Sequence, residues 1–162
     1  MAFEKIKYGQ VEPNHLSAQR TGQIYAQLPA ADSISALENG QFVKYDYANN
    51  VVTTDSKAEG EWMLVYNEVK LYDERLSYAD FRMEKANCVG GEMYPRVFKT
   101  NVGDIYTTNM IDAVEVEVGT KLAPNATGVL TTAGSDAEMI WKVVKVYTMA
   151  DGKPAVKLQR IK

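Results

Sequence analysis

From Gln41 onward the chain is a series of short β-type runs separated by turn residues. The runs 42–47 and 51–54 flank Asn49-Asn50, and asparagine tolerates the left-handed backbone that tight hairpin turns require. Further β-type runs lie at 61–66, 104–108 and 128–132. Short strands at regular spacing, bounded by turn signals, predict an all-β fold, mainly an antiparallel β-barrel or sandwich.

Two more segments support this fold class. Ala113–Val118 alternates valine with glutamate after its first residue, which is typical of a half-buried strand. The run Met139–Met149 contains apolar residues with lysines interspersed. Asp151-Gly152 follows it as a type I′ turn signature, and Pro154–Ile161 is expected to return as the second strand of a hairpin.

The first 32 residues have a different character. Gly9–Gln27 contains a proline, a glycine and four glutamines but no sustained apolar period. We favour an extended N-terminal arm that orders against a partner over a segment that lies on the chain's own surface. The sequence therefore divides into an arm, residues 1–32, and a β-rich domain, residues 33–162. We also expect a helical turn over Ser33–Leu37 and one short helix over roughly Ser77–Lys85.

Length and charge limit the possible functions. A chain of 162 residues fits one domain with an appended arm, and its net charge of −3 favours neither nucleic acid nor an anionic membrane. Its longest apolar runs are far shorter than the roughly 20 residues of a membrane-spanning helix. The N-terminus lacks the apolar region of a secretory signal, and a single cysteine fits assembly in a reducing cytosol.

The sequence offers few groups for catalysis. Its single histidine, His15, lies in the unpatterned N-terminal stretch, and its single cysteine, Cys88, has no histidine nearby in sequence. The clustered acids are Asp73, Glu74, Asp80 and Glu84. Neighbouring residues on an extended segment point to opposite faces, so adjacent acids would not converge on a cation. We therefore expect no enzyme, and no catalytic, cofactor or metal site.

Two motif-like segments have structural interpretations. Gly90-Gly91 lacks the lysine and hydroxyl residue that complete a phosphate-binding loop, which favours a simple turn. Asn125-Ala126-Thr127 matches a glycosylation acceptor, but it lies in a loop of a chain without a secretory signal.

Aromatic residues leave two interpretations open. The ten tyrosines and two tryptophans could form a stacking platform for single-stranded nucleic acid or sugar. Such platforms usually accompany a basic groove, whereas this chain is slightly acidic overall. Tyrosine also suits protein interfaces and core packing, and we favour these two roles.

Three segments resemble auxiliary head proteins of tailed bacteriophages, the capsid decoration or cement class. The resemblance lies in Leu37–Lys44, in Tyr72–Arg75 with Tyr78–Phe81, and in Pro95–Lys99 leading to Val102–Thr108. It spans roughly residues 37–109, and its motifs are turns and strands rather than catalytic signatures. The C-terminal hairpin has no counterpart in the resemblance.

The resemblance implies a virion component on the capsid surface, assembled in the cytoplasm of a bacterial host. Its expected partner is the major capsid protein, whose lattice it would stabilise against internal DNA pressure. A homo-oligomer is expected, with a trimer as one option, and no direct contact with nucleic acid or a membrane. Two alternatives remain: a tail, neck or head-fibre attachment protein, and a small ligand-binding β-barrel.

Overall fold

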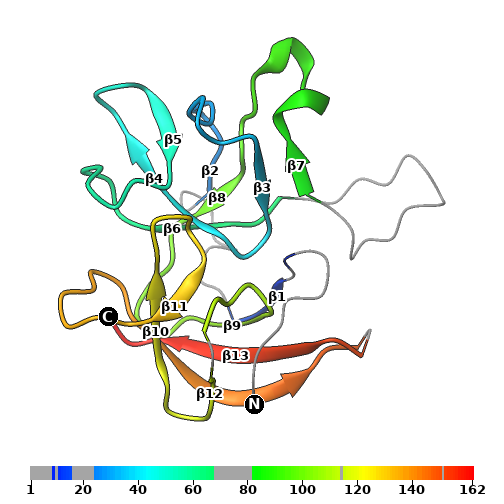
Figure 1. Ribbon diagram of the computed structural model, residues 1–162, viewed down its shortest axis with the longest axis vertical. Helices are drawn as coiled ribbons and strands as arrows, with labels where there is room; N and C mark the ends of the chain where they lie inside the picture. The colour runs from blue at the N-terminus through cyan, green and yellow to red at the C-terminus, as the bar shows by residue number, and fades with distance from the viewer. Residues whose placement is uncertain (1–8, 10, 16–23, 68–81, 114, 151) are drawn as a thin grey trace.

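The protein is an all-β molecule in the computed structural model, which describes residues 9, 11–15, 24–67, 82–113, 115–150 and 152–162 (Figure 1). Three antiparallel sheets make up the described part, which contains no α-helix and two short 3-10 turns. The predicted all-β class is confirmed. No helix in the described part of the chain is long and apolar enough to cross a bilayer.

The strands form sheets of six, five and two members. The larger sheet has the order β1 (Val11–His15), β9 (Ile105–Thr108), β13 (Pro154–Arg160), β12 (Trp141–Thr148), β10 (Lys121–Pro124) and β11 (Leu130–Thr132). The second has the order β2 (Ile24–Tyr25), β8 (Val97–Phe98), β6 (Met63–Val65), β4 (Phe42–Asp46) and β5 (Val51–Thr53). The smallest pairs β3 (Ala36–Glu38) with β7 (Arg82–Glu84), and the 3-10 turns η3 (Lys85–Asn87) and η4 (Val89–Gly91) follow β7.

Both predicted hairpins are present. In the C-terminal hairpin, β12 and β13 pair along their whole length, with an irregularity between Val143 and Lys145. Its far end extends beyond the body of the protein (Figure 1). Between β4 and β5, Asn50 adopts a positive φ of 54°, which is the left-handed conformation that asparagine tolerates. The expected strands at 61–66, 104–108 and 128–132 correspond to β6, β9 and β11.

Two local expectations were wrong. The described residues of Ala113–Val118 form no strand, although Val116 is 1% exposed and the flanking glutamates are exposed. Their alternation therefore reflects burial of an irregular segment rather than a sheet ladder. Ser33–Leu37 is not a helical turn, because its last two residues belong to β3, which pairs with the distant β7.

The expected short helix lies mostly outside the described residues. At its described end, Arg82–Glu84 is strand β7, and Lys85 begins the 3-10 turn η3.

Parts of residues 1–32 pair with the rest of the chain. Strand β1 is antiparallel to β9 at one edge of the six-stranded sheet, and β2 is antiparallel to β8 at one edge of the five-stranded sheet. That residues 1–32 act as an arm that contacts a partner stays a prediction.

The five-stranded sheet is buried on both faces. Phe42 and Leu64 are register partners within one apolar cluster, and the adjacent partners Val43 and Met63 lie within the other. Because successive side chains of a strand point to opposite faces, β4 and β6 contribute to two cores at once. The first cluster also contains Tyr106 and Trp141 of the six-stranded sheet. This packing holds the two large sheets together.

Candidate functional site

Of the four acids that cluster in the sequence, Glu84 lies within the described residues. Glu84 forms an ion pair with Arg82 and accepts a hydrogen bond from the Asn87 amide at 3.0 Å. Cys88 is half-buried, and its thiol donates to the Glu84 backbone carbonyl at 3.3 Å. Asp73, Glu74 and Asp80 lie outside the described residues. Among the residues with described positions, no three His, Cys, Asp or Glu side chains are placed to hold a metal ion.

The other singled-out residues take structural positions. His15 is the last residue of β1, where its backbone pairs with Ile105. Asn125 accepts hydrogen bonds from the Thr127 amide at 2.9 Å and the Val129 amide at 3.0 Å, so its side chain organises its own turn. Gly90 and Gly91 have positive φ values of 72° and 71°, as expected of turn glycines.

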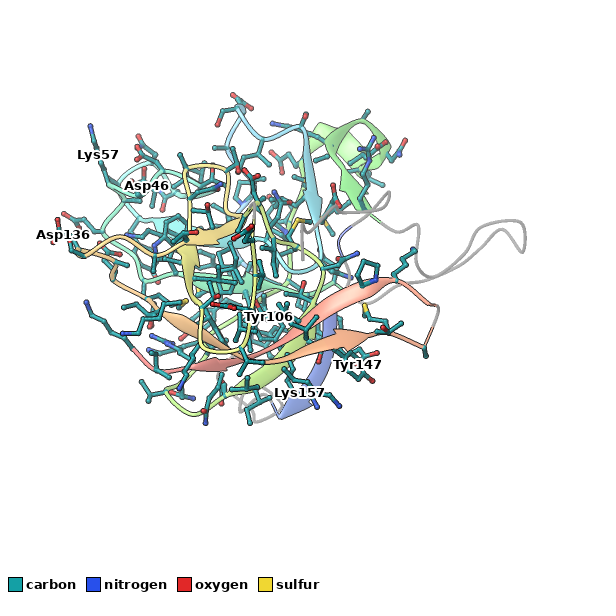
Figure 2. All side chains as sticks on the ribbon, turned by 60° about the horizontal axis from the view of Figure 1, so that its bottom comes forward. Asp46, Lys57, Tyr106, Asp136, Tyr147 and Lys157 are labelled. Atoms are coloured by element: carbon teal, nitrogen blue, oxygen red, sulfur yellow. The ribbon has the colours of Figure 1, made fainter. Side chains whose placement is uncertain are left out.

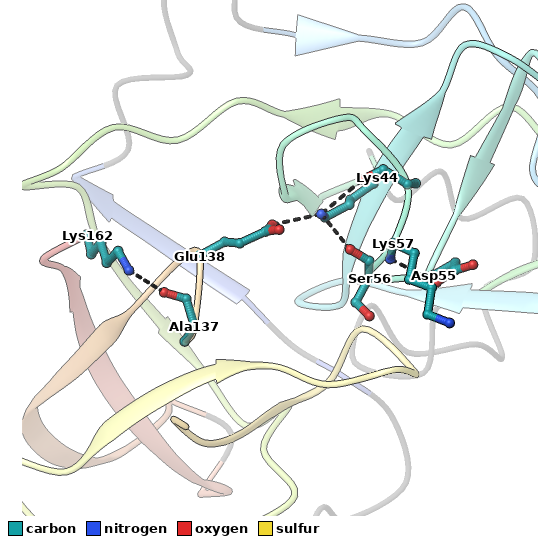
Figure 3. A network of polar contacts seen from close by, with 8 residues as sticks. Lys44, Asp55, Ser56, Lys57, Ala137, Glu138 and Lys162 are labelled. Carbon is teal, nitrogen blue, oxygen red and sulfur yellow. Dashed lines mark hydrogen bonds and ion pairs between the residues drawn. The ribbon is translucent and has the colours of Figure 1, made fainter. Parts of the chain in front are cut away.

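A buried lysine joins the two large sheets. The Lys44 side chain on β4 is 2% exposed, and its ammonium lies 2.7 Å from the carboxylate of Glu138 (Figure 3). It also donates to the backbone carbonyls of Ser56 at 2.9 Å and Ala58 at 3.1 Å, and it lies 5.2 Å from the ring centroid of Trp62. Three acceptors match the three donors of an ammonium group, so Lys44 is engaged structurally.

A shallow cleft adjoins this lysine. It has a volume of about 270 Å³, and its lining includes Trp62, Asp136, Glu138 and Met139. Trp62 is only 5% exposed, so its ring offers little surface for stacking a sugar or base. The Glu138 carboxylate is already paired with Lys44. These contacts leave the cleft few free groups with which to bind a ligand.

Several tyrosines pack against other residues. Tyr45 is 2% exposed and its ring makes edge-to-face contacts with Tyr25 at 5.8 Å and Tyr47 at 5.7 Å. Burial raises the pKa of the Tyr45 hydroxyl, which accepts a hydrogen bond from the Gln27 amide. Tyr106 is fully buried in the core. Neither ring is available to stack with a nucleobase.

The distinctive polar surface is a face of the six-stranded sheet that carries four lysines. Lys121 on β10 stands directly opposite Lys142 on β12, and Lys145 on β12 stands directly opposite Lys157 on β13. Residues opposite one another in an antiparallel ladder point to the same face. The register also places both pairs on one side of β12, away from the core residues Trp141 and Val143. We call these four residues the lysine face.

The charges of the lysine face have no carboxylate partner among the described residues. Lys121, Lys142 and Lys145 are exposed and Lys157 is half-buried, and none of them forms an ion pair with a described acid. Other described lysines do have a carboxylate partner: Lys44 pairs with Glu138, Lys85 with Asp32 and Lys99 with Glu61.

Tyr147 lies between two of these charges. The ammonium of Lys145 is 5.7 Å and that of Lys157 is 5.6 Å from its ring centroid, and Figure 2 shows Tyr147 and Lys157 together beside the hairpin. Cation–π attraction of about 0.5–1 kcal/mol per exposed contact holds the ammonium groups near the ring. Like charges directly opposite one another on a sheet are destabilising, so Tyr147 offsets part of a repulsion that no described carboxylate relieves.

The sequence contained part of this signal, in the lysines spaced through the C-terminal hairpin. It did not show Lys121 joining them, because that depends on the pairing of β10 with β12. Comparisons with protein-family models, with curated proteins and with solved structures found no match. The lysine face is therefore the feature from which a function can be inferred.

Proposed function

We propose that this chain is a virion structural protein of a tailed bacteriophage: a capsid decoration, or cement, protein that binds the major capsid protein lattice and stabilises the head. The observation that carries the proposal is the lysine face, a concentration of positive charge without a carboxylate partner among the described residues, on a protein with a net charge of −3. Like charges opposite one another destabilise a sheet, and proteins tend to accept such a cost at functional surfaces.

Protection of a sheet edge does not account for three of the four lysines. Proteins often place lysine on an exposed edge strand to prevent pairing with another chain. Lys121, Lys142 and Lys157 lie at positions where their strands have a neighbour on each side, whereas Lys145 lies past the pairing of β12 with β10. Those three lysines point outward from the middle of the sheet.

Exposed apolar side chains support a role among several neighbouring subunits. Val89 is 99% exposed in η4, Tyr47 is 66% exposed just after β4, and Val118 is 64% exposed before β10. These positions belong to three separate segments of the chain. Burying one valine side chain contributes about 1.5 kcal/mol or more, so contacts at several such positions would add to the affinity for a lattice.

Residues 1–32 contribute to the same proposal as an arm that contacts the capsid. A segment that adds a strand to a neighbouring sheet gains affinity through backbone hydrogen bonds. Removing residues 1–8 tests this contribution, because β1 and every later strand remain in the shortened chain. The shortened chain should bind heads more weakly than the full chain. Equal binding by the two chains would mean that residues 1–8 make no contact.

Quantitative mass spectrometry of purified virions, with immunogold labelling, tests the proposal. We expect the chain in many copies per particle, with gold over the head. Absence from washed virions would overturn the proposal, and gold confined to the tail or neck would favour the alternative of a tail, neck or head-fibre protein. Light scattering of the purified chain would then show whether it is a homo-oligomer, such as a trimer, before it binds.

A further inference from the structure

We propose that the lysine face binds an extended acidic segment of a protein partner, with carboxylates two residues apart. The inference rests on the proposed function and names the partner chemistry at the same surface. Its basis is the geometry of the two lysine pairs and of the strand that connects them.

The two pairs form two rows along the sheet. Lys121 and Lys142 make the first row, and Lys145 and Lys157 make the second. Lys142 stands opposite Gln159 and Lys145 opposite Lys157, so the irregularity after Val143 leaves the two rows two β13 residues apart, which is roughly 7 Å along a strand. An extended partner points every second side chain to the same face, and these side chains are also about 7 Å apart. Such a segment can therefore place a carboxylate at each row.

The hairpin also offers room beside β12. Strand β10 pairs with β12 only at Trp141 and Lys142, and the loop before β10 continues the hydrogen bonding to Val143. The remaining residues of β12, Val144–Thr148, extend past this pairing. An extended partner segment that runs along this part of the hairpin would meet Lys145 and Tyr147.

An acidic polypeptide fits this surface better than a nucleic acid does. Binding of single strands relies on aromatic rings on which bases stack, whereas the Tyr147 ring already has an ammonium group near it from each of two lysines. The four charged groups of the face are lysines, and the nearby Arg160 on β13 stands opposite Trp141, which places it on the other face of the sheet. The net charge of −3 also repels a long polyanion more than it repels a short acidic segment.

One acid shares this face near its edge. Glu12 on β1 stands opposite Thr107 of β9, and Thr107 stands opposite Lys157 of β13. Thr107 thus separates Glu12 from the second row. This position limits where the acidic partner can lie: it should contact β12 and β13 and stop short of β1.

Fluorescence anisotropy with three labelled probes tests the inference. The probes are a ten-residue peptide of alternating glutamate and threonine, its glutamine counterpart, and a ten-nucleotide oligothymidine. Each is titrated into the full-length wild-type chain and into the double variant Lys145→Gln/Lys157→Gln. The matched control is Lys57→Gln/Lys85→Gln, which removes the same charge at other described sites. Circular dichroism melts check that all three proteins are folded.

The acidic peptide should bind the wild-type chain and the control variant equally, and bind the lysine-face variant roughly tenfold more weakly, because two charge contacts are lost. Raising the salt from 50 to 300 mM should reduce binding further. The inference is overturned if the glutamate peptide does not bind, if both double variants lose the same affinity, or if oligothymidine binds more tightly than the peptide.

Co-sedimentation with purified heads separates this inference from the proposed function. If the wild-type chain binds heads and the lysine-face variant binds less, the proposed function and the further inference both stand. If the two proteins bind heads equally, the proposed function stands and the lysine face is not the contact. If the wild-type chain does not bind heads, the proposed function fails whatever the peptide shows.

Discussion

The ammonium of Lys44 and the carboxylate of Glu138 lie 2.7 Å apart and connect the two large sheets. Lys44 belongs to β4 of the five-stranded sheet, and Glu138 lies three residues before β12 of the six-stranded sheet. The Lys44 side chain is 2% exposed, whereas that of Glu138 is 61% exposed. The lysine is therefore the buried member of the pair, and its removal should cost more than removal of the glutamate.

Replacing Lys44 with methionine should lower the free energy of unfolding by roughly 2–3 kcal/mol, because the carbonyls of Ser56 and Ala58 lose their buried donor along with the carboxylate. Urea denaturation measures this change. Glu138→Gln keeps an oxygen acceptor at an exposed position and should cost less than about 1 kcal/mol. Equal losses in the two variants would show that Lys44 stabilises the fold only through its pair with Glu138, and that its bonds to Ser56 and Ala58 contribute nothing.

Gly128 should not tolerate a side chain. An added Cβ would lie 2.1 Å from the Phe42 carbonyl oxygen, and the φ of Gly128 is +76°. Gly119 has a comparable φ of +98° but open space around it, which makes it a matched control. Gly119→Ala should cost about 1–2 kcal/mol for the backbone conformation alone. Gly128→Ala should cost clearly more in thermal and urea unfolding, since β4 must also move; similar losses would mean that the close approach to Phe42 carries no cost.

Removing the hydroxyl of Tyr106 should not destabilise the protein. This hydroxyl is buried without a hydrogen-bond partner among the described residues, and the ring packs edge-to-face on Trp141 at 4.8 Å. Burial raises the pKa of Tyr106 well above its usual value, so the group stays neutral. Tyr106→Phe keeps the ring and removes the unsatisfied group, and should raise stability by up to about 1 kcal/mol. A loss above that size would reveal a buried partner for the hydroxyl, such as a water molecule.

Acid should weaken the β4–β5 turn through Asp46. Hydrogen bonds from the Asn49 side chain and backbone, and from the Ala48 backbone, lower the pKa of Asp46 below 3.8. A carboxyl with a lowered folded-state pKa stabilises the fold above its unfolded-state pKa, and this contribution is lost as the pH falls through the folded-state value. NMR titration should therefore place the midpoint of Asp46 protonation below pH 3.8, and the signals of the turn residues should shift over the same pH range. In Asp46→Asn that acid transition should disappear; an Asp46 that titrates at or above 3.8 would contradict the turn geometry.

The sequence predicted elements whose signals are local. Asn49-Asn50 marks a turn between adjacent runs, and the β12–β13 hairpin follows from apolar runs on either side of a Gly-containing turn. The prediction of a strand over Ala113–Val118 was wrong because alternation indicates which side chains are buried and not which backbone groups are paired. Strand β3 was missed because its partner, β7, lies more than 40 residues away, and three residues carry too little pattern.

The lysine face could not be predicted from the sequence because it depends on how distant segments pair. Lysines 142, 145 and 157 are visible in the C-terminal runs, but their common face depends on the register of β12 against β13 and on the irregularity after Val143. Lys121 joins them only through the pairing of β10 with β12. No residue in the sequence signals this pairing, which brings together segments about 20 residues apart.

Saturation binding of the wild-type chain to purified heads of its own virus tests the central claim most directly. The chain is titrated onto a fixed quantity of heads, and the pelleted fraction is measured after centrifugation. The account predicts saturation at a fixed ratio of chain to major capsid protein, and heads that withstand more heating before releasing DNA. A pelleted fraction that stays at the level of the chain centrifuged alone would contradict it.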